Sequence, residues 1–381
     1  ITAQLIDVAD GYHFWSQRYD RELDDIFTVQ EEIALAIVDK LRIQLLGKEK
    51  ERLMRRHTDD VAAHSIYLEG RYFWNQRKAD SLQKAIACFR RAIDRDPNYA
   101  LPYVGLADSF SILGTYGFLM PNEAFAQARA AAQRALELCG ELGEAHATLG
   151  WIYTIHDFKW SAGETALSRA IELSPSYASA HCWLAMSLLG QGRRDEALKA
   201  ARRSRELDPL SLAINANLGL VLTFAGLVDE AILQYRRTLE LERRFPLAHL
   251  WLGAAYLVKG DYDAATAAFT DGMQVGGHNP FALGHLVIAL SASGKTAQAG
   301  EPLRRVESPP PQGYHSSYCR AVARFGVNDD DAAYALLDQA YEERDPMLIF
   351  VQSLRRFPCL ADRVEKDARY ARFLKRIDLK L

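Results

Sequence analysis

The chain has 381 residues, of which 49% are hydrophobic and 25% are charged, and its formal net charge is -3 at pH 7. This composition is ordinary for a globular chain. The net charge does not indicate a basic surface that would bind nucleic acid. No apolar run approaches the roughly eighteen residues that span a bilayer, and no signal peptide is visible. Five cysteines without CxxC spacing indicate a reducing compartment, so we expect a cytoplasmic protein.

The first 60 residues differ from the rest of the chain. Residues 1–15 alternate apolar and polar side chains for several positions and turn at Asp10-Gly11, which is typical of a β-strand followed by a hairpin. From Phe27 the apolar residues follow i+4 steps, so we expect a linking helix at about 27–46, with Asp24 or Asp25 available to cap it. One or two strands do not form a stable sheet alone. We therefore expect 1–60 to be the remnant of an α/β domain whose sheet lies upstream of Ile1.

The strand at the start of the chain leaves an edge that needs a partner. Residues 1–20 are therefore expected to be disordered, to pair as a local hairpin, or to exchange with a second copy of the chain. The last of these outcomes predicts a homodimer formed through the N-terminal strand. All three stay open at the level of the sequence.

A period of 34 residues governs most of the remaining chain. Four glycines and one asparagine recur at this interval: Gly192, Gly226, Gly260, Gly294 and Asn328. Gly and Asn tolerate the positive φ at which a helix ends and the chain reverses. A second series holds small residues where helices approach, including Gly219 and Gly253, and a third holds apolar side chains between helices, including Tyr235 and Phe269. Such a period predicts stacked helix hairpins.

This pattern resembles the tetratricopeptide repeat, whose units place Leu-Gly, an aromatic residue, Ala and Pro at set offsets. One unit shows the whole pattern: Leu149, Gly150, Tyr153, Ala170 and Pro175. Prolines in the same phase are expected to close second helices: Pro97, Pro175, Pro209 and Pro311. The resemblance implies an all-α, right-handed superhelical solenoid of about eight units at 61–345, with capping helices at 346–381.

Both ends of the chain resemble a second known arrangement. Residues 2–41, TAQLIDVADGYHFWSQRYDRELDDIFTVQEEIALAIVDKL, are similar to the end of a TolB-like α/β region that precedes tetratricopeptide arrays in bacterial regulatory proteins. Residues 354–379 are similar to the way such chains end. In that family the upstream effector is a class III adenylate or guanylate cyclase domain, a winged-helix DNA-binding domain or a protein kinase domain. The resemblance implies a regulatory region, and the effector stays open.

We expect no catalytic, cofactor or metal site in this chain. The string SGKT at 293–296 resembles the end of a phosphate-binding loop, but Ala289 stands where that motif needs Gly, and the string lies between two helices. The acidic run at 328–333 is interpreted as helix capping. Three histidines share one repeat position: His146, His181 and His249. Their spacing is too wide for one zinc ion, so we interpret them as hydrogen-bonded packing residues.

Arginine also recurs once per unit on the second helices. The positions are Arg91, Arg134, Arg169, Arg203, Arg237 and Arg305. A row of this kind could bind nucleic acid, but an acidic residue follows three positions later in five of the six. That spacing places opposite charges side by side on one helix. We therefore interpret the row as a solvated, self-neutralised face and expect no nucleic-acid binding by this chain.

The concave surface of such a solenoid is lined by the first helix of each hairpin. Counting from the small residue of each unit gives eight groove positions: Met186, Leu189, Leu220, Phe224, Ala254, Leu257, Ile288 and Ser291. Because these are mostly apolar, we predict a groove for an amphipathic helix or an extended apolar segment of a protein or peptide. The alternative is that they pack against neighbouring helices or against the chain's own ends.

The sequence therefore predicts a non-catalytic protein-protein interaction and regulatory module. A partner or an intramolecular segment in the groove would shift an upstream effector between states, by no more than its difference in affinity for the two states. The helix at about 27–46 is the expected coupling element. Two alternative functions are also open. The chain is then a regulatory fragment of an adenylate or guanylate cyclase, or a regulatory fragment of a winged-helix transcription regulator.

Overall fold

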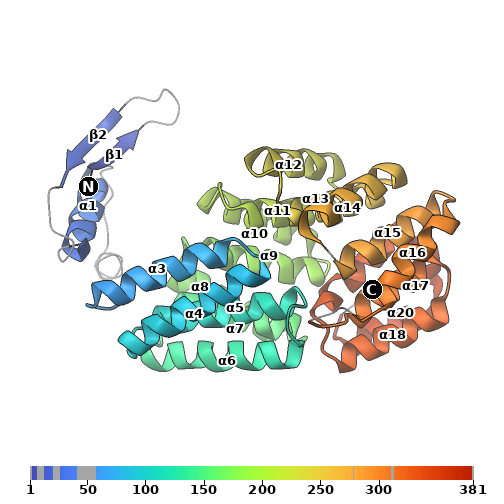
Figure 1. The fold of residues 1–381 in the computed structure, drawn as a ribbon, viewed down its shortest axis with the longest axis horizontal. Helices are drawn as coiled ribbons and strands as arrows, with labels where there is room; N and C mark the ends of the chain where they lie inside the picture. The colour runs from blue at the N-terminus through green and yellow to red at the C-terminus, as the bar shows by residue number, and fades with distance from the viewer. Residues whose placement is uncertain are drawn as a thin grey trace. The chain divides into compact units, whose positions relative to one another are not determined.

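The fold is known from a computed structural model that describes residues 2–6, 13–19, 26–40, 57–277, 279–309 and 313–379. The chain divides into two compact units, Ile1–Gly105 and Leu106–Leu381. Figure 1 shows that nearly all of the described residues are helical. The domain boundaries expected near residues 61 and 346 rest on the sequence and stay predictions.

The N-terminal strands pair with each other. Strand β1 (Thr2–Ile6) runs antiparallel to β2 (His13–Arg18), with Thr2 opposite Arg18. Of the three outcomes expected for residues 1–20, the structure shows the local hairpin, and the expected turn at Asp10-Gly11 lies outside the described residues. Helix α1 (Ile26–Lys40) occupies most of the predicted linking helix, whose expected cap and last residues also lie outside the described range.

The first helix hairpin consists of α3 (Val61–Asn75) and α4 (Ala79–Arg95). A carboxylate oxygen of Asp60 accepts hydrogen bonds from the backbone N–H groups of residues 62 and 63, which caps α3, and Arg95 at the end of α4 pairs with the same carboxylate at 2.8 Å. Between the helices, a Cβ added at Gly70 would lie 2.5 Å from the ring of Phe89. The absence of a side chain at Gly70 therefore permits this packing.

Seven further hairpins follow along the chain. Their first helices are α5 (Ala100–Thr115), α7 (Gly143–Ile155), α9 (Ala178–Gly190), α11 (Leu212–Ala225), α13 (Pro246–Lys259), α15 (Pro280–Ala292) and α17 (Ser317–Gly326). Their second helices are α6 (Pro121–Leu138), α8 (Trp160–Leu173), α10 (Arg194–Leu207), α12 (Val228–Leu241), α14 (Tyr262–Gly276), α16 (Thr296–Glu307) and α18 (Asp330–Glu342). The described residues between 61 and 342 thus form eight consecutive helix hairpins, in agreement with the predicted all-α solenoid.

The helix ends follow the periodic residues. Four glycines and one asparagine have positive φ at the turn inside their hairpins: Gly192 (79°), Gly226 (96°), Gly260 (79°), Gly294 (78°) and Asn328 (62°). Three second helices end two residues before a proline, namely α4 before Pro97, α8 before Pro175 and α10 before Pro209. Pro311 lies outside the described residues. The local chemistry of the repeat therefore determines where these helices end.

Close helix approach within a hairpin uses one glycine and one aromatic residue. A Cβ added at Gly253 of α13 would lie 2.7 Å from the ring of Phe269 on α14, and one at Gly219 of α11 would overlap the ring of Tyr235 on α12. Both aromatic side chains are completely buried. The small residues and the large apolar residues that recur every 34 positions thus contact each other within each of these hairpins.

The chain continues past the last hairpin through η2 (Pro346–Arg356), α19 (Ala361–Lys366) and α20 (Ala368–Arg376). Capping helices were expected over this whole stretch, but η2 is a 3-10 helix and it contacts the first helices α7, α9 and α17. Farther on, the indole N–H of Trp160 in α8 donates a hydrogen bond to the backbone oxygen of Ile377 at 2.7 Å. The end of the chain therefore folds back onto hairpins that lie far earlier in the sequence.

Candidate binding groove

The eight predicted groove residues lie on α9, α11, α13 and α15, the first helices of four consecutive hairpins. Six of them are buried: Met186, Leu220, Phe224, Ala254, Leu257 and Ile288. Leu189 and Ser291 are half-buried. Part of this burial is packing between hairpins, since Ile288 lies against Gly326 of α17. Phe224 also contacts Phe357, which belongs to residues 345–357, here called the C-terminal segment.

Phe350 is the central aromatic contact of the C-terminal segment. Its ring centroid lies 5.4 Å from that of Trp251 on α13 and 6.1 Å from that of Phe281 on α15. The rings are tilted or edge-on, as the quadrupoles of aromatic rings favour. Only 7% of Phe350 is exposed. Complete burial of a phenylalanine side chain is worth about 1.5–3 kcal/mol. Phe350 therefore contributes strongly to the free energy that holds the C-terminal segment against the first helices.

Phe357 is the second aromatic contact and is completely buried. Its ring lies 6.4 Å from that of Phe224 on α11, one of the predicted groove residues, and 5.5 Å from that of His285 on α15. Burial lowers the pKa of His285 to about 4, although a hydrogen bond to the backbone oxygen of Phe281 opposes that shift. His285 is therefore neutral near pH 7 and packs as an aromatic ring.

The contacts of the C-terminal segment extend along the array. Residues of η2 contact α7, α9 and α17, and the aromatic contacts of Phe350 and Phe357 add α11, α13 and α15. On α9, Gly190 leaves space for Ile349, whose Cγ1 would lie 3.0 Å from a Cβ at that glycine. One segment thus contacts the first helices of six consecutive hairpins. We call the surface formed by these six helices the groove.

A buried carboxylate holds the start of the C-terminal segment. Asp345 accepts hydrogen bonds from the Ser316 hydroxyl at 2.7 Å, from the Tyr318 backbone N–H at 3.0 Å, and from the Met347 backbone N–H at 3.0 Å. Burial raises the pKa of Asp345, and these hydrogen bonds counter part of that rise. The carboxylate thus joins the start of η2 to the start of α17. Asp345 followed by Pro346 is a sequence signal for the start of a helix. Nothing in the sequence indicates that the hydrogen-bond donors to Asp345 lie at the start of α17.

The three repeated histidines are hydrogen-bonded, as predicted. Each donates from Nε2 to the backbone oxygen six residues earlier, at 3.2 Å for His146, 3.0 Å for His181 and 3.0 Å for His249. Asn215 occupies the same place in the intervening hairpin and donates to the backbone oxygen of Pro209 at 2.7 Å. These side chains close the turn before each first helix. Within the described residues, no group of three or more His, Cys, Asp or Glu side chains could hold a metal ion.

The acidic run caps a helix and forms ion pairs, and the lysine of the SGKT string also forms an ion pair. The carboxylate of Asp329 accepts from the backbone N–H of Ala332 and caps α18, as predicted. The next two acidic residues also form ion pairs, Asp330 with Arg363 at 3.1 Å and Asp331 with Arg369 at 2.6 Å. In the string, Lys295 precedes α16 and pairs with Asp263 at 2.6 Å.

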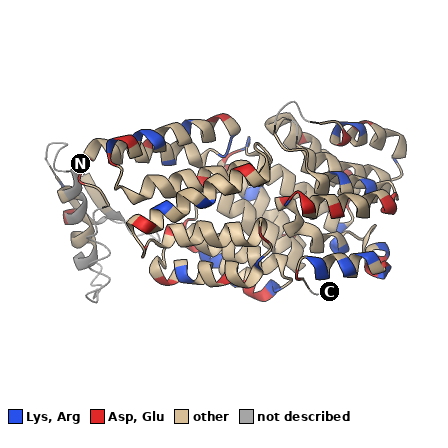
Figure 2. Ribbon diagram, turned by 90° about the horizontal axis from the view of Figure 1, so that it is seen from below, with Lys and Arg blue, Asp and Glu red and all other residues tan. Residues whose placement is uncertain are grey.

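The structure shows three of the five ion pairs that were expected along the arginine row. Ion pairs at i,i+3 spacing join Arg134 to Glu137, Arg169 to Glu172 and Arg203 to Glu206, at 2.8, 3.0 and 3.0 Å. Arg91 instead pairs with Glu69 on the preceding helix at 3.9 Å, and among the described residues no ion pair joins Arg237 to Glu240. Figure 2 shows acidic and basic residues interspersed along the helices.

Comparison with known proteins agrees with this geometry. The tetratricopeptide repeat family matches residues 159–211, 184–241 and 216–271, and a second model with the same description matches residues 74–99. The chain contains tetratricopeptide repeats. The matched stretches lie within the hairpins formed by α3 to α14. No helix among the described residues is both long enough and apolar enough to cross a membrane.

One curated relative has a name that suggests an effector. "Putative adenylate cyclase 3" of Rhizobium meliloti (strain 1021) is 34% identical over 154 residues, which are 39% of this chain and 26% of the relative. The chain thus matches about a quarter of that relative's length.

Among solved structures, yeast Tom70 is 16% identical with a TM-score of 0.48, and the match covers 80% of this chain and 68% of Tom70. A tetratricopeptide repeat protein of Thermus thermophilus is 17% identical with a TM-score of 0.42, and the match covers 51% of this chain and 99% of that protein.

Proposed function

We propose that this tetratricopeptide array is a non-catalytic interaction and regulatory module whose groove exchanges its own C-terminal segment for a peptide of a partner protein. The observation that carries the proposal is the contact of residues 345–357 with six consecutive first helices. A short 3-10 helical segment with buried aromatic anchors and one buried carboxylate has the chemistry of a peptide ligand. The groove thus binds apolar, aromatic segments, and the chain supplies one itself.

An attached segment competes strongly with an external one. A tethered ligand acts at an effective concentration on the order of millimolar, so a partner peptide must bind the free groove tightly or be present at high local concentration. The partner shifts the array between the occupied and the free state only by its preference for the free groove. Release of the C-terminal segment is therefore the regulated step in this proposal.

A double variant, Phe350→Ala with Phe357→Ala, tests the proposal in the full chain. Because both aromatic anchors are lost, we expect the C-terminal segment to leave the groove while the hairpins stay folded. A fluorescent peptide of residues 345–358 should then bind the double variant and bind the unchanged chain at least about tenfold more weakly. Fluorescence anisotropy measures the affinity, and circular dichroism measures the remaining helix content.

Met347→Ala is the matched control, since Met347 lies in the same segment and is only half-buried. This variant should bind the added peptide no better than the unchanged chain. The proposal fails if the double variant keeps its helices but does not bind the peptide. It also fails if the double variant loses most of its helix content, because the segment would then be part of the core and not an exchangeable ligand.

A second candidate function is the regulation of a nucleotidyl cyclase. The name of the Rhizobium meliloti relative supports this function. In this form of the proposal the groove regulates a class III nucleotidyl cyclase encoded upstream, with α1 as the coupling element, in the cytoplasm. The five cysteines are unpaired, in keeping with a reducing compartment. A winged-helix effector and a homodimer through the N-terminal strand stay predictions of the sequence.

A further inference from the structure

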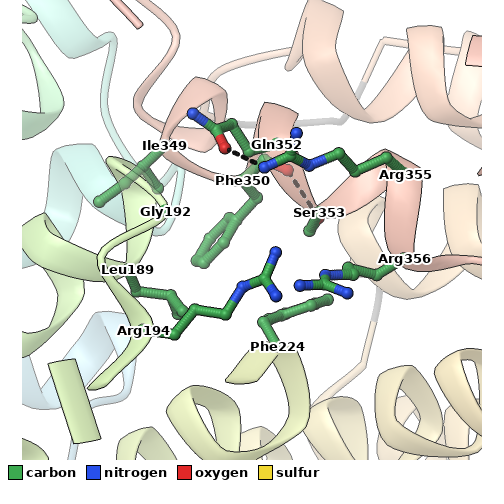
Figure 3. Close-up of a pocket in the computed structure, with 10 residues that line it drawn as sticks. All are labelled: Leu189, Gly192, Arg194, Phe224, Ile349, Phe350, Gln352, Ser353, Arg355 and Arg356. Carbon is green, nitrogen blue, oxygen red and sulfur yellow. Dashed lines mark hydrogen bonds between the residues drawn. The ribbon is translucent and has the colours of Figure 1, made fainter. Parts of the chain in front are cut away.

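Two arginine side chains lie side by side at a small cavity between the array and the C-terminal segment, and a third arginine also lines it. Arg194 is the first residue of α10, and Arg355 and Arg356 are the last two residues of η2. All three line a cavity of about 30 Å³, together with Leu189 and Phe224. Figure 3 shows the guanidinium groups of Arg194 and Arg356 side by side, with that of Arg355 directed toward Gln352.

Neither Arg194 nor Arg356 forms an ion pair with a carboxylate of the described residues, and Nη2 of Arg356 is buried without a hydrogen-bond partner. Arg355 donates to the side-chain oxygen of Gln352 at 2.9 Å, which leaves its charge uncompensated as well. Nearby arginines differ, because Arg193 pairs with both Glu164 and Glu196. The same holds for three arginines after the segment: Arg363, Arg369 and Arg376 each pair with at least one carboxylate.

Adjacent guanidinium groups without a counter-charge repel one another, most strongly where water is partly excluded. Leaving a buried charged donor unsatisfied also costs free energy. An anion in the cavity would remove both costs, since guanidinium groups bind oxyanions through paired N–H donors. The apolar walls formed by Leu189 and Phe224 strengthen such hydrogen bonds by lowering the local dielectric constant.

We propose that this cavity is a binding site for a phosphate group. The two adjacent positive charges of Arg194 and Arg356 match a phosphate dianion better than a singly charged carboxylate. The ligand is either the free phosphate ion or the end of a phosphorylated small molecule. This site goes beyond the proposed function. Its consequence rests on that function: because Arg194 belongs to the array and Arg356 to the segment, bound phosphate joins the two and opposes release of the segment.

Titration of the full chain with inorganic phosphate tests the site. Thermal unfolding and isothermal titration calorimetry are compared with acetate at equal ionic strength, set with sodium chloride. We expect phosphate to raise the melting temperature in a saturable way and acetate to have no specific effect. O-phosphoserine is the second probe: tighter binding than inorganic phosphate identifies an ester as the ligand, and weaker binding identifies the free ion.

Two variants and one control keep the test decisive. Arg194→Gln and Arg356→Gln should each weaken phosphate binding at least about tenfold, since each removes a charged, two-pronged donor. Arg202→Gln should leave binding unchanged, because Arg202 lies on the same helix, is exposed and pairs with Glu230.

The proposal is overturned if phosphate causes no saturable stabilisation, if acetate binds as well, or if all three variants respond alike. The peptide experiment on the double variant is performed without phosphate, so its result stands apart from this one.

Discussion

The hairpins and the C-terminal segment are buried against each other, yet they are specified in different ways. In the hairpins one contact recurs, a glycine facing an aromatic ring, as in Gly253 with Phe269. In the C-terminal segment no contact recurs, since Phe350 and Phe357 meet different helices and different partners. A repeat is specified by neighbouring residues and the next repeat. The position of the C-terminal segment depends on several hairpins together.

The burial of the helices shows the effect of the segment. Helix α15 buries ten of its 13 residues, whereas α16 of the same hairpin buries three of its 12. A helix with solvent on one side keeps a polar stripe, and a helix that is apolar all round is buried on all sides. Helix α15 is apolar all round, in keeping with its position, since α14 and α17 pack against it and Phe350 of the C-terminal segment contacts its Phe281.

The largest effect is expected within the hairpins. Phe269→Ala should lower the free energy of unfolding by about 3–5 kcal/mol, because it removes a completely buried ring and leaves a cavity beside Gly253. Urea unfolding followed by circular dichroism measures the change. Thr270→Ala is the neighbouring control at an exposed position and should change stability by less than about 1 kcal/mol. A similar small loss for both variants would show that the repeated contact does not hold the hairpin together.

Acid should weaken the contact between groove and segment. The pKa of His285 is about 4 in the folded chain against an ordinary value of 6.5, so the unfolded chain binds more protons between these values. Stability is therefore full above pH 6.5 and is lost as the pH falls toward 4. From pH 7 to pH 5 the loss should be on the order of 2 kcal/mol.

His285→Phe removes this titration, so the comparison of the two chains isolates it from other groups. Urea unfolding at both pH values measures the difference, and the variant should lose less stability on acidification than the unchanged chain. Equal losses in the two chains would mean that His285 does not control the acid response.

The smallest effect is expected at the helix ends. Gly226 has a φ of 96° and no atom near a would-be Cβ, so Gly226→Ala should cost about 1 kcal/mol through backbone conformation alone. Gly300 lies within α16, where Gly300→Ala should instead stabilise by about 0.5–1 kcal/mol. Melting temperatures of the two variants should therefore move in opposite directions. A shift of both in the same direction would contradict the role assigned to the positive φ.

Sequence reasoning predicted which positions of the first helices are apolar, but not what covers them. Leu220 and Leu257 are on first helices, where the period placed them, and both are completely buried. Periodicity identifies which side of a helix is apolar but not which atoms cover it. The phosphate cavity could not be predicted from the sequence for a related reason. Arg194 and Arg356 are far apart in the chain, and they become neighbours only because of where the C-terminal segment lies.

The sequence alone determined the array of hairpins, the positions of their turns and the small-to-large contacts inside them. These features depend on backbone preferences and on side chains within one repeat, and the 34-residue period displays them directly. Only the tertiary structure decided that residues 345–357 occupy the groove. That placement requires simultaneous burial of Phe350, Phe357 and Asp345 against helices distant in sequence, and no local pattern encodes such a set of contacts.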